Sequence, residues 1–189
     1  MMRKRFLQLL RGCVLIGTCF SLLLVGACAK KQSEEEPSPG VAKQNDPAIM
    51  EREVSVLLRH IDGKTVQFSE YRGRIVLVNF FASWQRKDFA ELVPIMAELQ
   101  RKTQKRVDVI YVAIDEASEV TVRRFIEEHN VTYDVFVNGK EVAGAFGGVG
   151  KLPATFIVYD DGKLIDRIEG LRSRRYYWGR LFRTLKRRS

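Results

Sequence analysis

Residues 75–88 read IVLVNFFASWQRKD, and this stretch decides the fold. Its first seven residues form a run that is apolar except for Asn79, as expected of a central strand covered on both faces. Apolar side chains then recur at helical spacing, and they are Phe89, Leu92, Val93, Met96 and Leu99. A buried strand followed at once by an amphipathic helix predicts an α/β arrangement, with Trp84 to Asp88 at the junction of the two elements.

The segments around this junction alternate between strand and helix patterns. Two short strand-like segments flank an Asp62-Gly63 turn, which predicts an N-terminal β-hairpin. Residues 107–114 predict a second buried strand, and Ser118 is placed to cap the helix that follows it. The order of these elements favours a sheet that contains parallel strands.

The C-terminal part continues the alternation. Residues 155–159 and 163–168 flank an Asp-Gly turn and predict a second hairpin. We expect the glycine-rich segment 144–151 to be a loop that passes close to the first helix. The inner stripe expected for a closing helix consists of Trp178, Leu181, Phe182 and Leu185. The predicted fold class is therefore α/β, with a mixed central sheet flanked by helices.

The N-terminus has the pattern of a secretory signal peptide. A basic start at residues 3–5 precedes an uncharged, largely apolar run at 13–27, which is short for a membrane-spanning helix. The sequence LVGAC at 24–28 resembles a bacterial lipoprotein signal, in which the cysteine is acylated and becomes the mature N-terminus. An uncleaved signal anchor is the alternative, and cleavage before Cys19 would leave few apolar residues ahead of it.

Processing at Cys28 would leave the mature chain without a free thiol. The three cysteines are Cys13, Cys19 and Cys28, all at or before the predicted cleavage site. Residues 28–48 are charged and rich in Ser, Pro and Gly, which predicts a disordered tether. Such a tether of about 20 residues has an end-to-end distance on the order of 25 Å. The predicted domains are a signal peptide at 1–27, a lipidated tether at 28–48 and a folded domain at 49–189.

The chain is basic, and the surplus of positive charge gathers at its C-terminus. The formal net charge of +9 falls to +5 when the four basic residues of the signal peptide are removed. No acidic residue follows Glu169, whereas basic residues recur at 172, 174, 175, 180, 183 and 186–188. This end either rests against anionic lipid headgroups or forms a solvated basic face. The export signal argues against nucleic acid as a partner.

Three sequence segments resemble the membrane-anchored, TlpA-type thioredoxin-like proteins of the redoxin (AhpC/TSA) group. They are DGKTVQFSEYRGRIVLVNFFASW at 62–84, VIYVAIDE at 109–116 and KLPATFIVYDDGKLI at 151–165. The first is similar to the family's VVNFWATWC, and the third to its GLPTTF, whose proline is a cis-proline that faces the active site. The resemblance covers about residues 50–189 and implies a thioredoxin-like fold with an N-terminal β-hairpin.

The departure from the family lies where the family has Trp-Cys-x-x-Cys. Gln85 matches the nucleophilic cysteine and Asp88 the resolving cysteine. An alignment anchored on Pro94 instead of Trp84 shifts the pair to Arg86 and Phe89. Neither alignment supplies a sulfur atom, so no catalytic residue is predicted. An amide cannot ionise or attack a disulfide as a thiolate does.

We predict that the residues around this degenerate motif bind a polypeptide. In the family, the main chain of the residue before the cis-proline pairs with a bound strand, and this pairing needs no thiol. The alternative is that the cis-proline only shapes its loop. Asp88 suits the positive end of the helix dipole, and the two preceding residues would make the rim cationic. The predicted binding residues are Trp84, Gln85, Arg86, Lys87, Leu152 and Pro153.

These observations predict a redox-inactive lipoprotein of the bacterial envelope that binds an envelope protein or peptide. The alternative is a member of the thiol-disulfide oxidoreductase family, of the cytochrome c maturation or antioxidant type, that works with a partner's thiol. A structural subunit of an envelope complex is a third class. Ala29 after Cys28 favours the periplasmic face of the outer membrane. No cofactor or metal is expected, because His60 and His129 have no cysteine to join them.

Overall fold

The computed structural model describes residues 51–104, 106–115 and 117–186. The predicted signal peptide at 1–27, the acylation site Cys28 and the tether at 28–48 lie outside these residues. Within the described ranges, no helix has the length and apolar character that crossing a bilayer requires.

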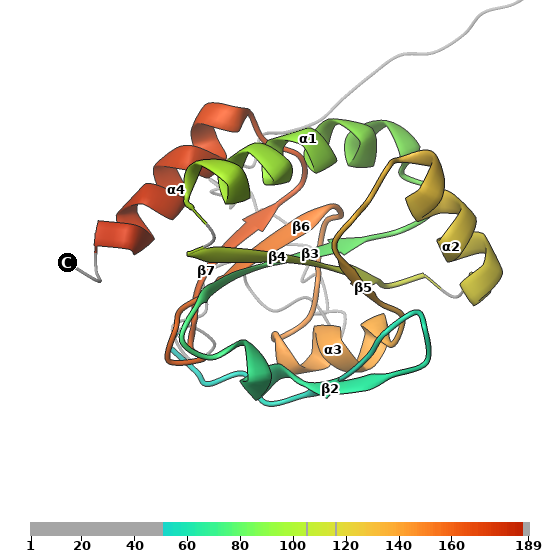
Figure 1. Ribbon diagram of the computed structural model, residues 1–189, viewed down its shortest axis with the longest axis horizontal. Coiled ribbons are helices and arrows are strands. Elements are labelled where there is room, and N and C mark those ends of the chain that lie inside the picture. The colour runs from blue at the N-terminus through green and yellow to red at the C-terminus, as the bar shows by residue number, and fades with distance from the viewer. Residues whose placement is uncertain (1–50, 105, 116, 187–189) are drawn as a thin grey trace, which may run out of the picture. The chain divides into compact units, whose positions relative to one another are not determined.

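A five-stranded mixed sheet forms the centre of the described chain (Figure 1). The spatial order is β5-β4-β3-β6-β7, in which β3 pairs in parallel with β4, and β4 with β5. β6 is antiparallel to β3, and β7 is antiparallel to β6, the second pairing being the one that the Asp-Gly hairpin predicted. The bounds are Ile75–Phe81 (β3), Val107–Ala113 (β4), Asp134–Phe136 (β5), Ala154–Val158 (β6) and Leu164–Glu169 (β7).

The predicted N-terminal hairpin is present as a separate two-stranded sheet. β1 (Leu57–Arg59) pairs antiparallel with β2 (Thr65–Gln67), with Leu58 opposite Val66. A short 3-10 helix, η1 (Phe68–Tyr71), then leads into the central strand. The Asp62-Gly63 turn therefore sets the register of this hairpin, as the sequence indicated.

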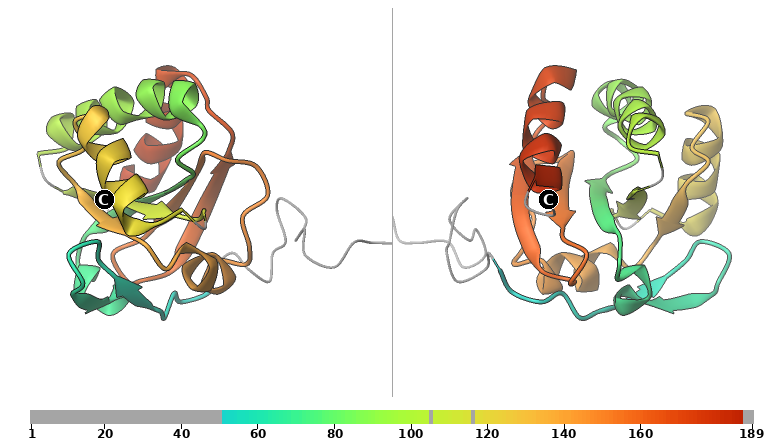
Figure 2. Two further views of the ribbon diagram at one scale, coloured as in Figure 1. Left: turned by 90° about the vertical axis from the view of Figure 1, so that its right-hand side faces the viewer. Right: turned by 60° about the vertical axis from the view of Figure 1, so that its left-hand side comes forward.

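Helices cover both faces of the central sheet (Figures 1 and 2). α1 (Arg86–Lys102), α2 (Glu119–Glu128) and α4 (Arg174–Lys186) lie side by side on one face. The short helix α3 (Gly139–Ala145) covers the other face together with the hairpin. The central strand β3 is buried along its whole length, because both faces of the sheet are covered.

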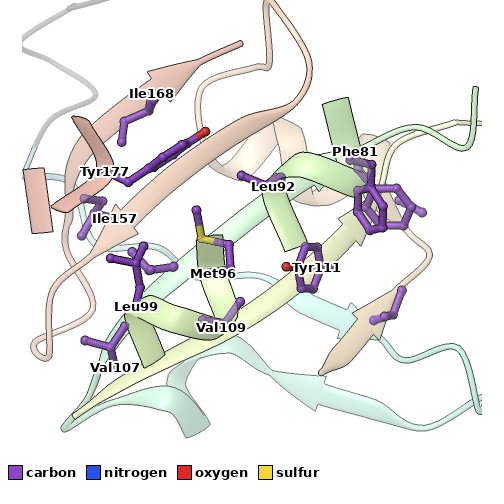
Figure 3. Packing of buried hydrophobic residues seen from close by; sticks show 14 of the residues in the cluster. Phe81, Leu92, Met96, Leu99, Val107, Val109, Tyr111, Ile157, Ile168 and Tyr177 are labelled. Atoms are coloured by element: carbon purple, nitrogen blue, oxygen red, sulfur yellow. The ribbon is translucent and has the colours of Figure 1, made fainter. Parts of the chain in front are cut away.

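Alternation along β3 divides the apolar residues between two clusters. On the α1 side, Leu92, Met96 and Leu99 pack over the sheet beside Tyr111 and Tyr177 (Figure 3). The opposite cluster is built from the sheet, α3, the hairpin and η1, and its largest members are Phe68, Phe80, Phe136, Phe146 and Phe156. Both clusters consist of residues between 54 and 185, so the described part of the chain contains its own core.

Three details differ from the sequence-based expectation. Phe182 is 54% exposed, whereas Tyr177 is buried, so the inner stripe of α4 was wrongly phased at this position. The buried residues of α4 are Tyr177, Leu181 and Thr184, and Phe182 lies one residue, or about 100°, away from that stripe. The start of the expected glycine-rich loop belongs to α3, on the sheet face opposite α1. The three-residue strand β5 was not predicted, because so short a segment has no detectable periodicity.

Candidate functional site

The junction between β3 and α1 fixes the main chain of the predicted site. The Gln85 N–H donates to the Ala82 carbonyl at 3.0 Å, and the Phe89 N–H donates to the Gln85 carbonyl at 3.1 Å. Gln85 is thus the N-cap of α1, but its side chain makes no capping hydrogen bond. That side chain is consequently available for a contact elsewhere.

The Gln85 side chain reaches the loop that contains the cis-proline. Its Nε2 donates a hydrogen bond to the Leu152 carbonyl at 3.0 Å, and the Leu152–Pro153 peptide bond is cis. The Oε1 of the same amide is buried and has no hydrogen-bond partner among the described residues. The structure therefore brings Gln85, Leu152 and Pro153 together across 67 positions of sequence.

The residues next to Gln85 in sequence differ in their exposure and in their contacts; they are Trp84, Arg86 and Lys87. The Trp84 side chain is 68% exposed, which is unusual for so large an apolar group. Arg86 forms an ion pair with Glu128 of α2, and its guanidinium lies 5.7 Å from the centroid of the Phe125 ring. Lys87 is exposed. The cationic rim is thus weaker than predicted, because Glu128 compensates the charge of Arg86.

The two candidate alignments of the degenerate motif occupy different environments. Gln85 faces the cis-proline loop, and Asp88 is half-buried in the first turn of α1. Arg86 turns toward α2, and Phe89 is completely buried in the core. Pro94 lies inside α1, which continues through it to Lys102. Of these four positions, the contacts of the described residues join only Gln85 to the cis-proline loop, whereas Arg86 pairs with α2 and Phe89 lies in the core.

A buried ion pair supports the cis-proline loop from β7. The side chains of Arg167 and Glu169 are paired and each is only 7% exposed. Glu169 Oε1 accepts a hydrogen bond from the Gly150 N–H at 3.3 Å, and a Cβ at Gly150 would lie 3.0 Å from that carboxylate. A side chain at position 150 would therefore require the Glu169 carboxylate to shift by a few tenths of an ångström. Sequence reasoning missed this support, because charged residues in an edge strand usually indicate exposure.

Neutral polar groups lie beneath the site. Asn79 is completely buried, and its Nδ2 donates to the carbonyls of Leu77 and Ile110 at 3.3 Å each. Its Oδ1 accepts from the Thr155 hydroxyl at 2.8 Å. Asn79 thus links β3, β4 and β6 without a titrating group.

The Asp115 carboxylate at the end of β4 accepts a hydrogen bond from the Ser83 N–H, which ties the junction between β3 and α1 to the neighbouring strand.

At this site the structure shows the Gln85–Leu152 hydrogen bond and the exposed ring of Trp84. No cysteine occurs after Cys28 in the sequence. Within the described part of the chain, no three His, Cys, Asp or Glu side chains gather where they could hold a metal ion.

A cavity of about 430 Å³ lies between β1, the end of β5 and α3. It is lined by Leu57, Arg59, Asp115 and Asn138, among others, and by none of the predicted binding residues.

Comparisons with known proteins agree with this architecture. The AhpC/TSA family profile matches residues 51–167. The thiol-disulfide oxidoreductase ResA of Bacillus thuringiensis is 30% identical over 112 residues, which span 58% of this chain and 63% of ResA. The match thus covers somewhat less than two thirds of that relative.

Solved structures show the same fold at lower sequence identity. A putative thiol:disulfide interchange protein DsbE from Chlorobium tepidum aligns with a TM-score of 0.64 at 22% identity, over 72% of this chain and 97% of its own. The exposed lipoprotein thioredoxin Etrx1 of Streptococcus pneumoniae aligns with a TM-score of 0.57 at 24% identity, over 68% of this chain and 98% of its own. These likenesses confirm the thioredoxin-like fold.

Proposed function

The chain belongs to the AhpC/TSA family of thioredoxin-like proteins, and we propose that it is a redox-inactive envelope lipoprotein that binds another envelope protein or peptide. The proposed binding surface consists of Trp84, Gln85, Arg86 and Lys87 together with Leu152 and Pro153. The proposed anchor is an acyl chain on Cys28.

The observation that carries the proposal is the hydrogen bond from the Gln85 amide to the Leu152 carbonyl. Gln85 stands where the resemblance places the nucleophilic cysteine. An amide has no ionisable proton near neutral pH, and it can neither form a thiolate nor accept a disulfide exchange. Asp88, at the second cysteine position, cannot resolve a mixed disulfide. The scaffold is retained while both reacting sulfur atoms are absent.

The exposed ring of Trp84, the residue before Gln85, suits peptide binding. Tryptophan is among the residues that contribute most binding energy at protein interfaces. A peptide strand that pairs with Leu152 must share or displace the Gln85 amide, since Gln85 already donates to the Leu152 carbonyl. The carbonyl has a second lone pair, but only displacement also releases the buried, unpaired Oε1 of Gln85. The affinity for a peptide therefore depends on exchanging the Gln85–Leu152 hydrogen bond for hydrogen bonds to the peptide.

Envelope localisation rests on the sequence before the described residues and on the relatives. The segment ending in Cys28 resembles a lipoprotein signal, and one structural relative is named an exposed lipoprotein thioredoxin. Ala29 after the modified cysteine favours the outer membrane. The tether at 28–48 would hold the folded domain near the bilayer surface.

The ResA relatives support a second candidate function. Their name is thiol-disulfide oxidoreductase, and the loop with a cis-proline is retained here. In this candidate, the chain positions a partner's thiol and substrate beside Trp84, and the partner supplies the reacting sulfur atoms. Redox activity would then appear only when that partner is added.

Two assays on the mature chain test redox inactivity. We expect no reduction of insulin and no reaction with a thiol reagent, since no free thiol remains after processing. Clear turnover by the purified chain alone would contradict the proposal. Turnover that requires a second envelope protein would instead favour the second candidate.

Crosslinking in intact cells tests the binding surface. A photoreactive residue at exposed Lys87 should capture a discrete partner, identified by mass spectrometry. The matched control places the same residue at Lys64, whose side chain is 80% exposed in the hairpin. Gln85→Ala should increase capture from position 87, because it frees the Leu152 carbonyl. Equal capture from positions 64 and 87 would argue against a specific surface at Trp84.

A further inference from the structure

The outer face of α4 carries cations that have no acidic partner among the described residues. Arg175, Arg183 and Lys186 are exposed, and no described carboxylate forms an ion pair with any of them. The sequence contains no acidic residue after Glu169. The positive charge of this face is therefore not neutralised within the described part of the fold.

The other cations of α4 are engaged with the domain. Arg180 forms an ion pair with Asp166 of β7. Arg174 Nε lies 3.2 Å from a carboxylate oxygen of Glu98 on α1. These pairs, together with buried Tyr177 and Leu181, hold the helix on the sheet. The outer cations are thus not required for docking α4 onto the domain.

Two aromatic side chains are exposed among these cations. Phe182 is 54% exposed and Tyr176 is 42% exposed. Lys186 Nζ lies 5.0 Å from the centroid of the Phe182 ring, and the Arg172 guanidinium lies 5.9 Å from that of Tyr176. Exposed aromatic rings interleaved with cations are typical of helices that lie in the interfacial region of a bilayer.

The described chain begins at the strand that α4 covers. The Glu51 N–H donates to the Leu164 carbonyl at 2.7 Å, and the Leu164 N–H donates to the Arg52 carbonyl at 2.9 Å. Leu164 is the first residue of the edge strand β7, and α4 packs over that strand through Ile168 and Tyr177 (Figures 2 and 3). The described chain therefore begins beside the β7 edge of the sheet, with Val54 and Leu164 in the cluster on the face opposite α4.

We infer that the outer face of α4 binds the surface of a bilayer containing anionic phospholipids. Arg175, Arg183 and Lys186 would contact lipid phosphates, and the rings of Tyr176 and Phe182 would lie at the boundary with the acyl chains. The inference extends the proposed function, since a single acyl chain is a weak anchor that a polybasic surface strengthens.

Membrane contact through α4 would orient the proposed binding surface. In Figure 1 the N-terminus of α1, which follows Gln85, lies at the end of the helical layer away from the C-terminus of α4. A domain resting on the outer face of α4 would therefore hold the Trp84 surface away from the lipid. Partners would reach that surface from the aqueous side.

Sedimentation with lipid vesicles tests the inference. The chain from Ala29 onward is used, because it lacks the apolar N-terminal segment and retains both apolar clusters. It should bind phosphatidylcholine vesicles that contain phosphatidylglycerol, bind poorly to phosphatidylcholine alone and be released by salt. Arg175→Glu with Arg183→Glu should weaken binding by roughly 30-fold or more, at about 5-fold for each lost cation. Phe182→Ser should weaken it even at low salt.

A matched control variant distinguishes binding by the outer face of α4 from a general effect of net charge. Lys64→Glu with Arg124→Glu changes the net charge equally at exposed sites on other elements and should bind almost as the parent does. Equal loss in both double variants, or equal binding to neutral vesicles, would overturn the inference. In a separate assay, capture of an added acidic protein by the outer face of α4 without any vesicle binding would also overturn the inference. The protein used carries no acyl chain, because it begins after Cys28, and the vesicle assay contains no other protein, so its result does not depend on Cys28 or on the Trp84 surface.

Discussion

Gln85 forms a structural hydrogen bond at the position where the resemblance places a reactive cysteine. Its amide joins the N-terminus of α1 to the cis-proline loop, and this contact occupies the main-chain carbonyl that a docking strand would use. A typical hydrogen bond of this kind contributes about 1 kcal/mol to stability. Because Gln85 Oε1 is buried without a hydrogen-bond partner among the described residues, the net contribution of the side chain is smaller. The position is therefore open to substitution at little cost in folding.

The variant Gln85→Cys with Asp88→Cys should regain thiol-disulfide activity. The helix N-terminus would lower the pKa of the first thiol below its usual value of about 8.5. We expect measurable insulin reduction with dithiothreitol as the electron donor, against none for the parent chain.

The single variant Gln85→Cys provides the control for this gain. It should react with one equivalent of thiol reagent but show no sustained turnover, because no resolving thiol is present. A folded double variant without activity would show that the scaffold has lost more than its sulfur atoms.

At the scale of elements, β7 determines the position of the candidate site. Arg167 and Glu169 lie opposite Phe156 and Ala154 of β6, directly after the cis-proline. The Arg167 guanidinium also lies 5.3 Å from the centroid of the Phe156 ring. Through Gly150, this pair fixes the loop that meets Gln85. The site is therefore held in place by a strand that contributes no residue to its surface.

Glu169→Gln should destabilise the domain strongly. Removing one partner of a buried ion pair leaves the other charge uncompensated, which costs about 3–5 kcal/mol. Urea unfolding followed by circular dichroism measures this loss.

Two further variants decide whether the buried charge is the cause. The pair Arg167→Met with Glu169→Leu should recover most of the stability, because no charge stays buried. Lys163→Met at the exposed pair with Asp161 should cost at most about 1 kcal/mol. If Glu169→Gln costs no more than Lys163→Met, the Arg167–Glu169 pair does not support the loop energetically.

At the scale of the whole domain, two apolar clusters share one sheet and no disulfide joins the described elements. Each large apolar side chain that becomes fully buried contributes about 1.5–3 kcal/mol. Tyrosines take part in both clusters, and burial raises the pKa values of Tyr71 and Tyr111 well above their usual range. Burial also raises the pKa of Tyr177. The fold consequently favours the protonated phenols.

Alkaline unfolding should therefore coincide with tyrosine ionisation. Since the folded-state pKa values are raised, this contribution to stability is complete below about pH 10 and is lost as the pH rises toward the folded-state values. The near-ultraviolet absorbance of tyrosinate should grow in step with the loss of far-ultraviolet circular dichroism.

Tyr111→Phe offers a check on the role of burial. The Tyr111 hydroxyl is buried without a hydrogen-bond partner among the described residues, so its removal should stabilise the domain by about 1 kcal/mol. The variant should also withstand a higher pH. Full ionisation of the tyrosines in a domain that remains folded would contradict this account.

The sequence by itself determined the order of the main elements and the absence of a thiol from the folded domain. The run at 75–81, the two Asp-Gly turns and the Ser118 cap each report a local preference, and local preferences can be read from neighbouring residues. Ser118 accepts the Thr121 N–H in the structure, as predicted. The same local signals were insufficient for β5 and α3, whose formation depends on pairing with β4 and on packing against the sheet.

Only the tertiary structure decided which groups meet. The Gln85 amide reaches a carbonyl 67 residues away, a buried pair in β7 supports that loop, and α4 turns Phe182 outward rather than Tyr177. Each of these outcomes depends on the relative placement of elements that are distant in sequence. Periodicity gives the apolar side of a helix to within about one residue, and long-range packing then selects the stripe that faces the sheet.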